Sequence, residues 1–295
     1  MRRGGQGEAL AVWVVWLLTL LAVVVTYSRI DAAELYNVEG NGLGLGLSRA
    51  AVHTNWPFAL VAIVLVLVAM RDLPRRAWWI AGPAIVLCAT MPWFVSQSHL
   101  DARWENLVPG VGVALALGLA VAAIRRSGTS FQPRLPGDPV RVVLAAIVLV
   151  LSLPWIAAEL GFHLPGDVFM GQELFRTADG HLEAAVHLGE HHGWHGSLLL
   201  LSALVLSRVQ AAGRLRVWLL VGTAALAAYG AVNATQDFWQ EQLVKRGTVD
   251  WAIPSALYPG LKPVTLVTLL LAGLAAWLLE REHVMFAREQ AILRA

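Results

Sequence analysis

The sequence predicts an all-α, polytopic integral membrane protein, on the grounds of its composition, its long apolar stretches and the distribution of its charges. Hydrophobic residues make up 57% of the 295 residues and charged residues 14%, against about 45–50% and about 25% in soluble domains. A soluble chain of this kind would expose large apolar patches. The net charge of +2 is too small to indicate a nucleic-acid partner, and the single cysteine, Cys88, excludes a disulfide framework.

Eight apolar stretches approach the length of about 20 residues that a helix needs to cross a bilayer. The expected spans are 9–27, 56–70, 77–95, 108–124, 140–159, 194–211, 217–233 and 263–280. The second stretch is short, and we expect its helix to begin several residues earlier, near Ala50.

The basic residues predict that both termini lie in the cytoplasm, because Lys and Arg are enriched in cytoplasmic loops. With this orientation 15 of the 22 basic residues fall on the inner side. They are Arg2, Arg3, Arg71, Arg75, Arg76, Arg125, Arg126, Arg134, Arg141, Arg208, Arg214, Arg216, Arg281, Arg288 and Arg294. The cell membrane is the expected location, with the histidine-rich loops on the extracytoplasmic side.

Short matching segments indicate that the eight spans form two parallel four-helix repeats. The tetrapeptide Ala-Ala-Glu-Leu recurs around Glu34 and Glu159, and Ala-Ala-Val-His ends at both His53 and His187. Each pair lies at the same topological place in its half, and four spans per unit give both units the same orientation. We expect one repeat over 1–126, a cytoplasmic linker over 127–139, and a second repeat with a short cytoplasmic tail over 140–295.

The second repeat has a histidine-rich outer loop, at about 161–195, that predicts the functional site. Five histidines lie within fifteen residues, together with two glutamates: His181, Glu183, His187, Glu190, His191, His192 and His195. Glu183, His187, His191 and His195 follow one another at intervals of four. Residues at this spacing share one face of an α-helix, so we expect a helical extension of the sixth span to present them together.

A row of imidazoles and a carboxylate predicts a site for a divalent transition metal, such as Zn, Cu(II) or Fe. The principal ligand candidates are Glu183, His187, His191 and His195, with His192 and His181 as further ligand candidates. If the metal is catalytic, Glu190 is the expected base. Other outer residues that would complete the site are Glu34, Glu159, His53, His99 and Asp237. The predicted partners are the lipid bilayer and the metal ion.

Other interpretations remain open at this point. The metal could be catalytic or cargo, which leaves both a membrane enzyme and a metal-handling protein. Gly189 and Gly193 weaken a helix, so the cluster could be a solvated loop, and histidines could instead form a pH-responsive cap. A metal-free or proton-coupled small-solute transporter, or an assembly or anchoring subunit of a membrane complex, are the alternative classes.

Overall fold

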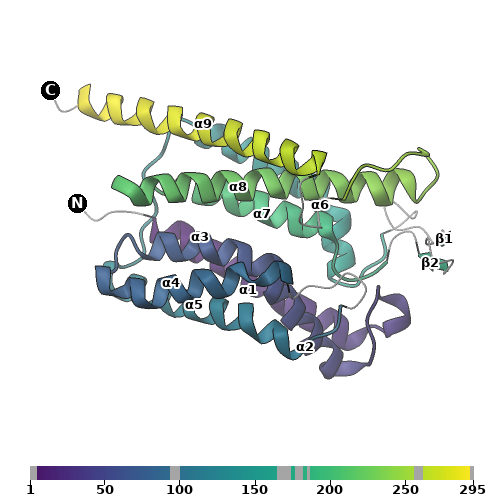
Figure 1. The fold of residues 1–295 in the computed structure, drawn as a ribbon. Helices are drawn as coiled ribbons and strands as arrows, with labels where there is room; N and C mark the ends of the chain where they lie inside the picture. Colours follow the sequence, from purple (N-terminus) through teal and green to yellow (C-terminus); the bar gives the residue numbers. More distant parts are fainter. Residues whose placement is uncertain are drawn as a thin grey trace.

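The computed structural model describes residues 5–93, 100–164, 174–176, 182–184, 187–255 and 262–292, most of them helical (Figure 1). The α-helices are α1 (Gln6–Arg29), α2 (Gly42–His53), α3 (Ala59–Ala69), α4 (Trp78–Ala89), α5 (Leu107–Ser127), α6 (Asp138–Glu159), α7 (His192–Leu206), α8 (Gly213–Asp237) and α9 (Pro263–Ile292). Two π-helical segments, Thr54–Phe58 and Phe238–Val244, follow α2 and α8. Strands β1 (Leu174–Arg176) and β2 (Leu182–Ala184) form an antiparallel pair.

Six helical stretches among the described residues are long and apolar enough to cross a membrane. They are Gln6–Arg29, Gly42–Ala69, Trp104–Ser127, Asp138–Glu159, Gly213–Val244 and Pro263–Met285. The predicted class, a helical membrane protein, is therefore supported. The other two expected spans contain the shorter helices α4 and α7, so the number eight stays a prediction.

Helix α2 begins at Gly42, well before the predicted start near Ala50. The reason lies in its packing on α1. A Cβ atom on Gly46 would be 2.2 Å from Ser28 Oγ and 2.4 Å from the carbonyl oxygen of Val24, so only glycine allows the two backbones to approach this closely. The early start adds about two helical turns, and α2 ends at His53.

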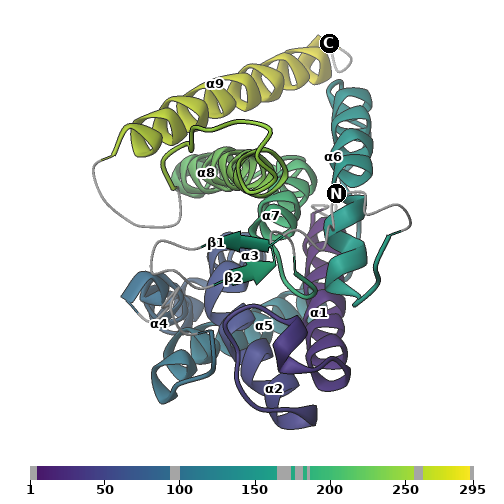
Figure 2. The same ribbon diagram turned by 90° about the vertical axis from the view of Figure 1, so that its right-hand side faces the viewer.

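Helix α3 forms the centre of the molecule (Figure 2). Its sequence is apolar on every side, which is typical of a helix surrounded by other helices, and it packs against α1, α4, α5 and α8. In the apolar window of the α2–α3 stretch 72% of the residues are buried, against none in α9. Exposed α9 side chains include Leu269, Leu270 and Trp277, and such an apolar surface is expected to contact lipid.

Helices α7 and α8 pack closely through two glycines. A Cβ atom on Gly196 would be 2.6 Å from the backbone nitrogen of Ala234 and from the carbonyl oxygen of Gly230. On Gly230 a Cβ atom would be 2.6 Å from the carbonyl oxygen of Gly196. This contact fixes the position of α7, which carries His195, relative to α8, which leads into Glu241.

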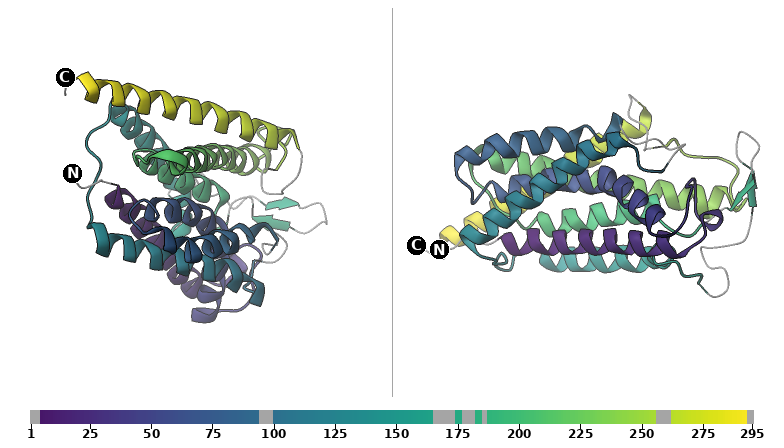
Figure 3. Two further views of the ribbon diagram at one scale, coloured as in Figure 1. Left: turned by 60° about the vertical axis from the view of Figure 1, so that its left-hand side comes forward. Right: turned by 90° about the horizontal axis from the view of Figure 1, so that it is seen from below.

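The first turn of α1 and the last turn of α9 lie at the same end of the molecule, and β1 and β2 lie at the other (Figures 1 and 3). At the end that carries the first turn of α1, the segment between α5 and α6 makes hydrogen bonds to α1 and to α9. The backbone nitrogen of Gln132 donates to Glu8 Oε1 over 2.8 Å, and that of Gly137 donates to Glu282 Oε1 over 2.8 Å. The repeat, its boundaries and the cytoplasmic location of this end stay predictions.

Candidate functional site

In the segment that was expected to be one continuous helix, the described residues before His192, 182–184 and 187–191, are not helical. Glu183 lies in β2, where it pairs with Phe175, and α7 begins only at His192. The prediction that Glu183, His187, His191 and His195 share one helical face is therefore wrong. The backbone of His191, with φ −119° and ψ 142°, is extended. Neighbouring side chains of an extended segment point in opposite directions, so Glu190 and His191 face different surroundings.

Gly189 explains why the helix cannot start earlier. Its φ of +94° lies in the left-handed region, which favours glycine. A Cβ atom at this position would be 2.5 Å from the Tyr27 hydroxyl, and the backbone nitrogen of Gly189 donates to the carbonyl oxygen of Ala158 over 2.9 Å. The next backbone nitrogen, that of Glu190, donates to the Tyr27 hydroxyl over 3.0 Å. Helices α1 and α6 thus fix the position of Glu190.

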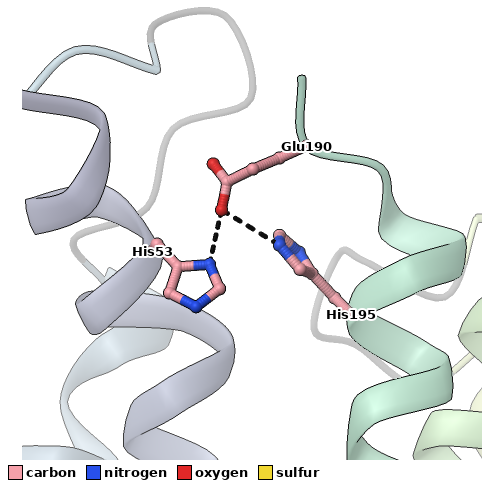
Figure 4. Close-up of side chains that lie close together, drawn as sticks. All are labelled: His53, Glu190 and His195. Atoms are coloured by element: carbon pink, nitrogen blue, oxygen red, sulfur yellow. Dashed lines mark hydrogen bonds and ion pairs between the residues drawn. The ribbon is translucent and has the colours of Figure 1, made fainter. Parts of the chain in front are cut away.

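The first group of site residues, called here the Glu190 cluster, consists of Arg49, His53, Glu190 and His195. Figure 4 shows one carboxylate oxygen of Glu190 facing both imidazoles. His195 Nε2 lies 3.1 Å from Glu190 Oε1, and His53 Nδ1 contacts the same oxygen. The Arg49 guanidinium pairs with the other oxygen, Oε2. The four residues come from α2, the segment before α7, and α7 itself, and each is between 1% and 6% exposed.

Arg49 keeps the Glu190 carboxylate ionised. Burial alone would raise the pKa of Glu190, but Arg49 and His53 beside it hold that pKa well below its usual range. The arginine is itself held in place, because its guanidinium lies over the Tyr27 ring at 5.4 Å and donates to the carbonyl oxygen of Leu100. An ionised carboxylate can only accept hydrogen bonds, so both imidazoles donate to it.

Each imidazole of the Glu190 cluster keeps its second nitrogen without a partner. His53 Nε2 and His195 Nδ1 are buried and make no hydrogen bond with the described residues. The two rings lie edge to face, with centroids 5.1 Å apart, and Trp56 lies against His195 at 5.4 Å. A buried nitrogen without a partner is costly, so these histidines have unused capacity to bind a ligand.

Glu159, at the end of α6, lies beside the Glu190 cluster. Its backbone carbonyl accepts a hydrogen bond from the Thr26 hydroxyl, and its carboxylate interacts electrostatically with Glu190 and Arg49. Both carboxylate oxygens are buried and make no hydrogen bond with described residues. The repeat-related Glu34, in contrast, is exposed in a short 3-10 turn after α1.

The second group, called here the Glu241 cluster, consists of His187, His191 and Glu241. His191 Nδ1 lies 2.9 Å from Glu241 Oε2, and His191 Nε2 lies 2.8 Å from the carbonyl oxygen of His187. The rings of His187 and His191 are stacked, with centroids 4.4 Å apart and planes at 10°. Lys245 Nζ lies 3.7 Å from Glu241 Oε1. Glu241 belongs to a π-helical segment, a rare conformation that is frequent at functional sites.

His191 is paired on both ring nitrogens, which is the arrangement of a charged imidazole. Burial disfavours this charge, but the nearby Glu241 carboxylate raises the pKa of His191 to about 9. Because both nitrogens face oxygen acceptors, both donate hydrogen bonds when the ring is protonated. In the Glu241 cluster, His191 and Glu241 therefore form an ion pair in which both nitrogens of His191 have an oxygen partner.

In both clusters the ligand atoms are close enough together that they could hold a metal ion. In each, three ligand atoms lie within 4.8 Å of one another: those of His53, Glu190 and His195 in one cluster, and those of His187, His191 and Glu241 in the other. The single site predicted from the sequence is thus two groups in the structure.

The remaining predicted residues are distributed as follows. His192 is half-buried against Trp56 and belongs to neither group. Asp237 is buried near the Glu241 cluster, at the end of α8. His181 and His99 lie outside the described residues.

Sequence reasoning missed Arg49 and the role of Glu241. Arg49 is a basic residue on the predicted outer side, where basic residues are few, and it precedes His53 by four positions. This i, i+4 spacing on the longer helix α2 could have identified it.

Comparisons of the chain with protein-family models, curated protein sequences and solved structures find no match.

Proposed function

We propose that the protein is a metal-dependent membrane enzyme whose centre is the Glu190 cluster, with His53, Glu190 and His195 as ligands of one divalent metal ion. The observation that carries this proposal is the convergence of two imidazole nitrogens on a single carboxylate oxygen (Figure 4). A separation of 3.1 Å between His195 Nε2 and Glu190 Oε1 suits two atoms that share an ion at about 2.0–2.2 Å from each. The ion would lie where the two imidazole N–H groups now face the carboxylate, and each ring would then carry its proton on its other nitrogen, His53 Nε2 or His195 Nδ1.

The kind of ligand favours Zn(II) or Fe(II). Two histidines and one carboxylate form the three-ligand set of catalytic zinc sites and of non-haem iron sites, both of which leave a position open for water or substrate. An ion held in this way polarises a bound group or activates water. Arg49 on the far carboxylate oxygen would orient Glu190 from outside the ligand shell.

The burial of the ligands favours a resident metal over a transported one. His53, Glu190 and His195 are each at most 4% exposed, and Glu190 is fixed through its backbone by Tyr27. In this assignment Glu190 is a ligand and not the base expected from the sequence. We assign the role of catalytic base to Glu159 instead, because its buried carboxylate has no hydrogen-bond partner among the described residues.

Metal analysis of the purified protein tests the proposal. After dialysis against a weak chelator, we expect Zn or Fe in the wild type and loss of one ion per chain in His53→Ala and in His195→Ala. His283→Ala is the matched control, because this histidine lies in α9, far along the chain from both clusters. Wild-type protein without bound metal, or variants that keep all of it while remaining folded, would refute the proposal.

The side of the membrane on which the centre lies is a separate part of the proposal. The basic residues predict that the end carrying β1 and β2 faces outward. In a Cys88→Ala background, Glu39→Cys, which precedes α2, should react with an impermeant thiol reagent in intact cells, and Ser127→Cys should not. The reverse labelling pattern would place the centre on the cytoplasmic side.

A further inference from the structure

We infer that the Glu241 cluster is a second, weaker site for a divalent metal ion, with the Asp237 carboxylate buried beside it. The inference goes beyond the proposed function, because it concerns different ligands and holds whether or not the Glu190 cluster binds metal. Its ligand atoms, from His187, His191 and Glu241, lie within 4.8 Å of one another.

Asp237 supplies the independent observation that points to an ion. It lies four residues before Glu241, so the two acids are neighbours on the same side of the helical turn. Asp237 is 6% exposed, and its Oδ2 makes no hydrogen bond with the described residues. A Cβ atom on Gly193 would be only 2.6 Å from that oxygen, so the carboxylate lies directly against the first turn of α7. A buried carboxylate oxygen without a partner is costly.

The two oxygens of the Glu241 carboxylate have different partners, and an ion could bind at Oε2 without affecting the lysine. Lys245 approaches Oε1 at 3.7 Å, whereas His191 approaches Oε2 at 2.9 Å. An ion placed between Oε2 and His191 Nδ1 would therefore not have to displace the lysine. One carboxylate and two imidazoles form a ligand set that suits Zn(II).

The second site should bind its ion more weakly and exchange it faster. Both nitrogens of His191 already make contacts, to Glu241 and to the carbonyl oxygen of His187, and the ion must break one of them. His187 is only half-buried and stacks on Tyr36 at 5.1 Å, so this cluster is more accessible than the Glu190 cluster. We expect an affinity for Zn(II) at least tenfold lower than that of the first site.

Titration of the metal-free, full-length protein in detergent with Zn(II) alone tests the inference. We expect two ions per chain in the wild type and one in the double variant Asp237→Asn with Glu241→Gln, which should lose the weaker ion. The control is Glu105→Gln, because Glu105 also has a buried oxygen without a hydrogen bond to any described residue but belongs to neither cluster. It should keep both ions.

The outcomes separate this inference from the proposed function. A wild type that binds one ion, lost in His53→Ala and kept in the Asp237 and Glu241 double variant, overturns the second site alone. A wild type that binds one ion, kept in His53→Ala and lost in the Asp237 and Glu241 double variant, supports the second site and refutes the first. Two ions that persist in the folded double variant also overturn the second site.

Discussion

The Glu190 and Glu241 clusters share one short stretch of chain but differ in the state of their imidazoles. In the Glu190 cluster each histidine makes one contact to the carboxylate and has a second, buried nitrogen without a hydrogen bond among the described residues. In the Glu241 cluster His191 uses both of its nitrogens. The charge partners differ as well, because Glu190 pairs with the buried Arg49 and Glu241 with Lys245 at 3.7 Å.

The difference shows that similar residue types can form a site whose imidazoles each keep one nitrogen without a hydrogen bond to the described residues, or a site in which an imidazole already uses both nitrogens. At the Glu190 cluster an ion would lie between groups that are already placed by α1, α2 and α7. At the Glu241 cluster a proton on His191 already balances the carboxylate, and an ion must compete with it. The two clusters should therefore respond differently to mutation and to pH.

The largest expected effect is on the free energy of unfolding, which should fall more when Glu190 is replaced than when Glu241 is replaced. Glu190→Ala leaves Arg49 buried without its partner, which should cost about 3–5 kcal/mol of unfolding free energy. Glu241→Ala should cost less, because His191 can release its proton. Denaturant unfolding of the metal-free variants in detergent measures both. Adding Arg49→Leu to Glu190→Ala should restore part of the loss. Equal losses for the two single variants would contradict the distinction.

A substitution between α7 and α8 should affect both clusters together. Gly196→Ala would place a methyl group 2.6 Å from two backbone atoms of α8, and the helices must separate at a cost of about 1–3 kcal/mol. Because α7 carries His195 and α8 leads into Glu241, we expect lower Zn(II) affinity at both sites. Gly118→Ala, which has open space around it, is the control and should leave stability and both affinities unchanged. Loss at one site only would show that the clusters are positioned independently.

The pH dependence of metal binding should differ between the sites. With a pKa of about 9, His191 is protonated at neutral pH, so an ion at the Glu241 cluster must release that proton. The affinity there should fall about tenfold for each unit that the pH drops below about 9. Glu190, whose pKa lies well below its usual range, is already ionised, so this carboxylate adds no such dependence at the first site. Zn(II) titrations between pH 7 and pH 9 measure both slopes, and equal slopes would contradict the assignment of His191 as the charged group.

The smallest effect is expected for His192→Gln. His192 is half-buried and contacts the Trp56 ring but belongs to neither cluster. Both Zn(II) affinities should stay within about twofold of the wild type, as is usual for substitutions outside special features. A loss of either ion in this variant would mean that the site boundaries drawn here are wrong.

The sequence predicted the helical class, because apolar length is a local property. It also named as candidates five residues that the structure brings into the two clusters: His53, His187, Glu190, His191 and His195. It did not predict how these residues are grouped. The interval of four between His187, His191 and His195 indicated one helical face, but a left-handed Gly189 next to Tyr27 keeps the chain extended up to His191. The histidine that joins His195 at Glu190 is His53, which belongs to a helix far away in the sequence. Such a contact depends on how the helices pack, which a local sequence pattern does not predict.

Glu190 and His191 are consecutive residues whose side chains belong to different clusters. Only one peptide bond separates the two residues, so a main-chain shift at one of them on ion binding would also alter the position of the other. Occupancy of the two sites is therefore expected to be thermodynamically coupled, and the coupling is reciprocal: whatever factor the first ion imposes on the second affinity, the second ion imposes on the first. If both clusters bind ions, the extended backbone at His191 would link the two binding equilibria.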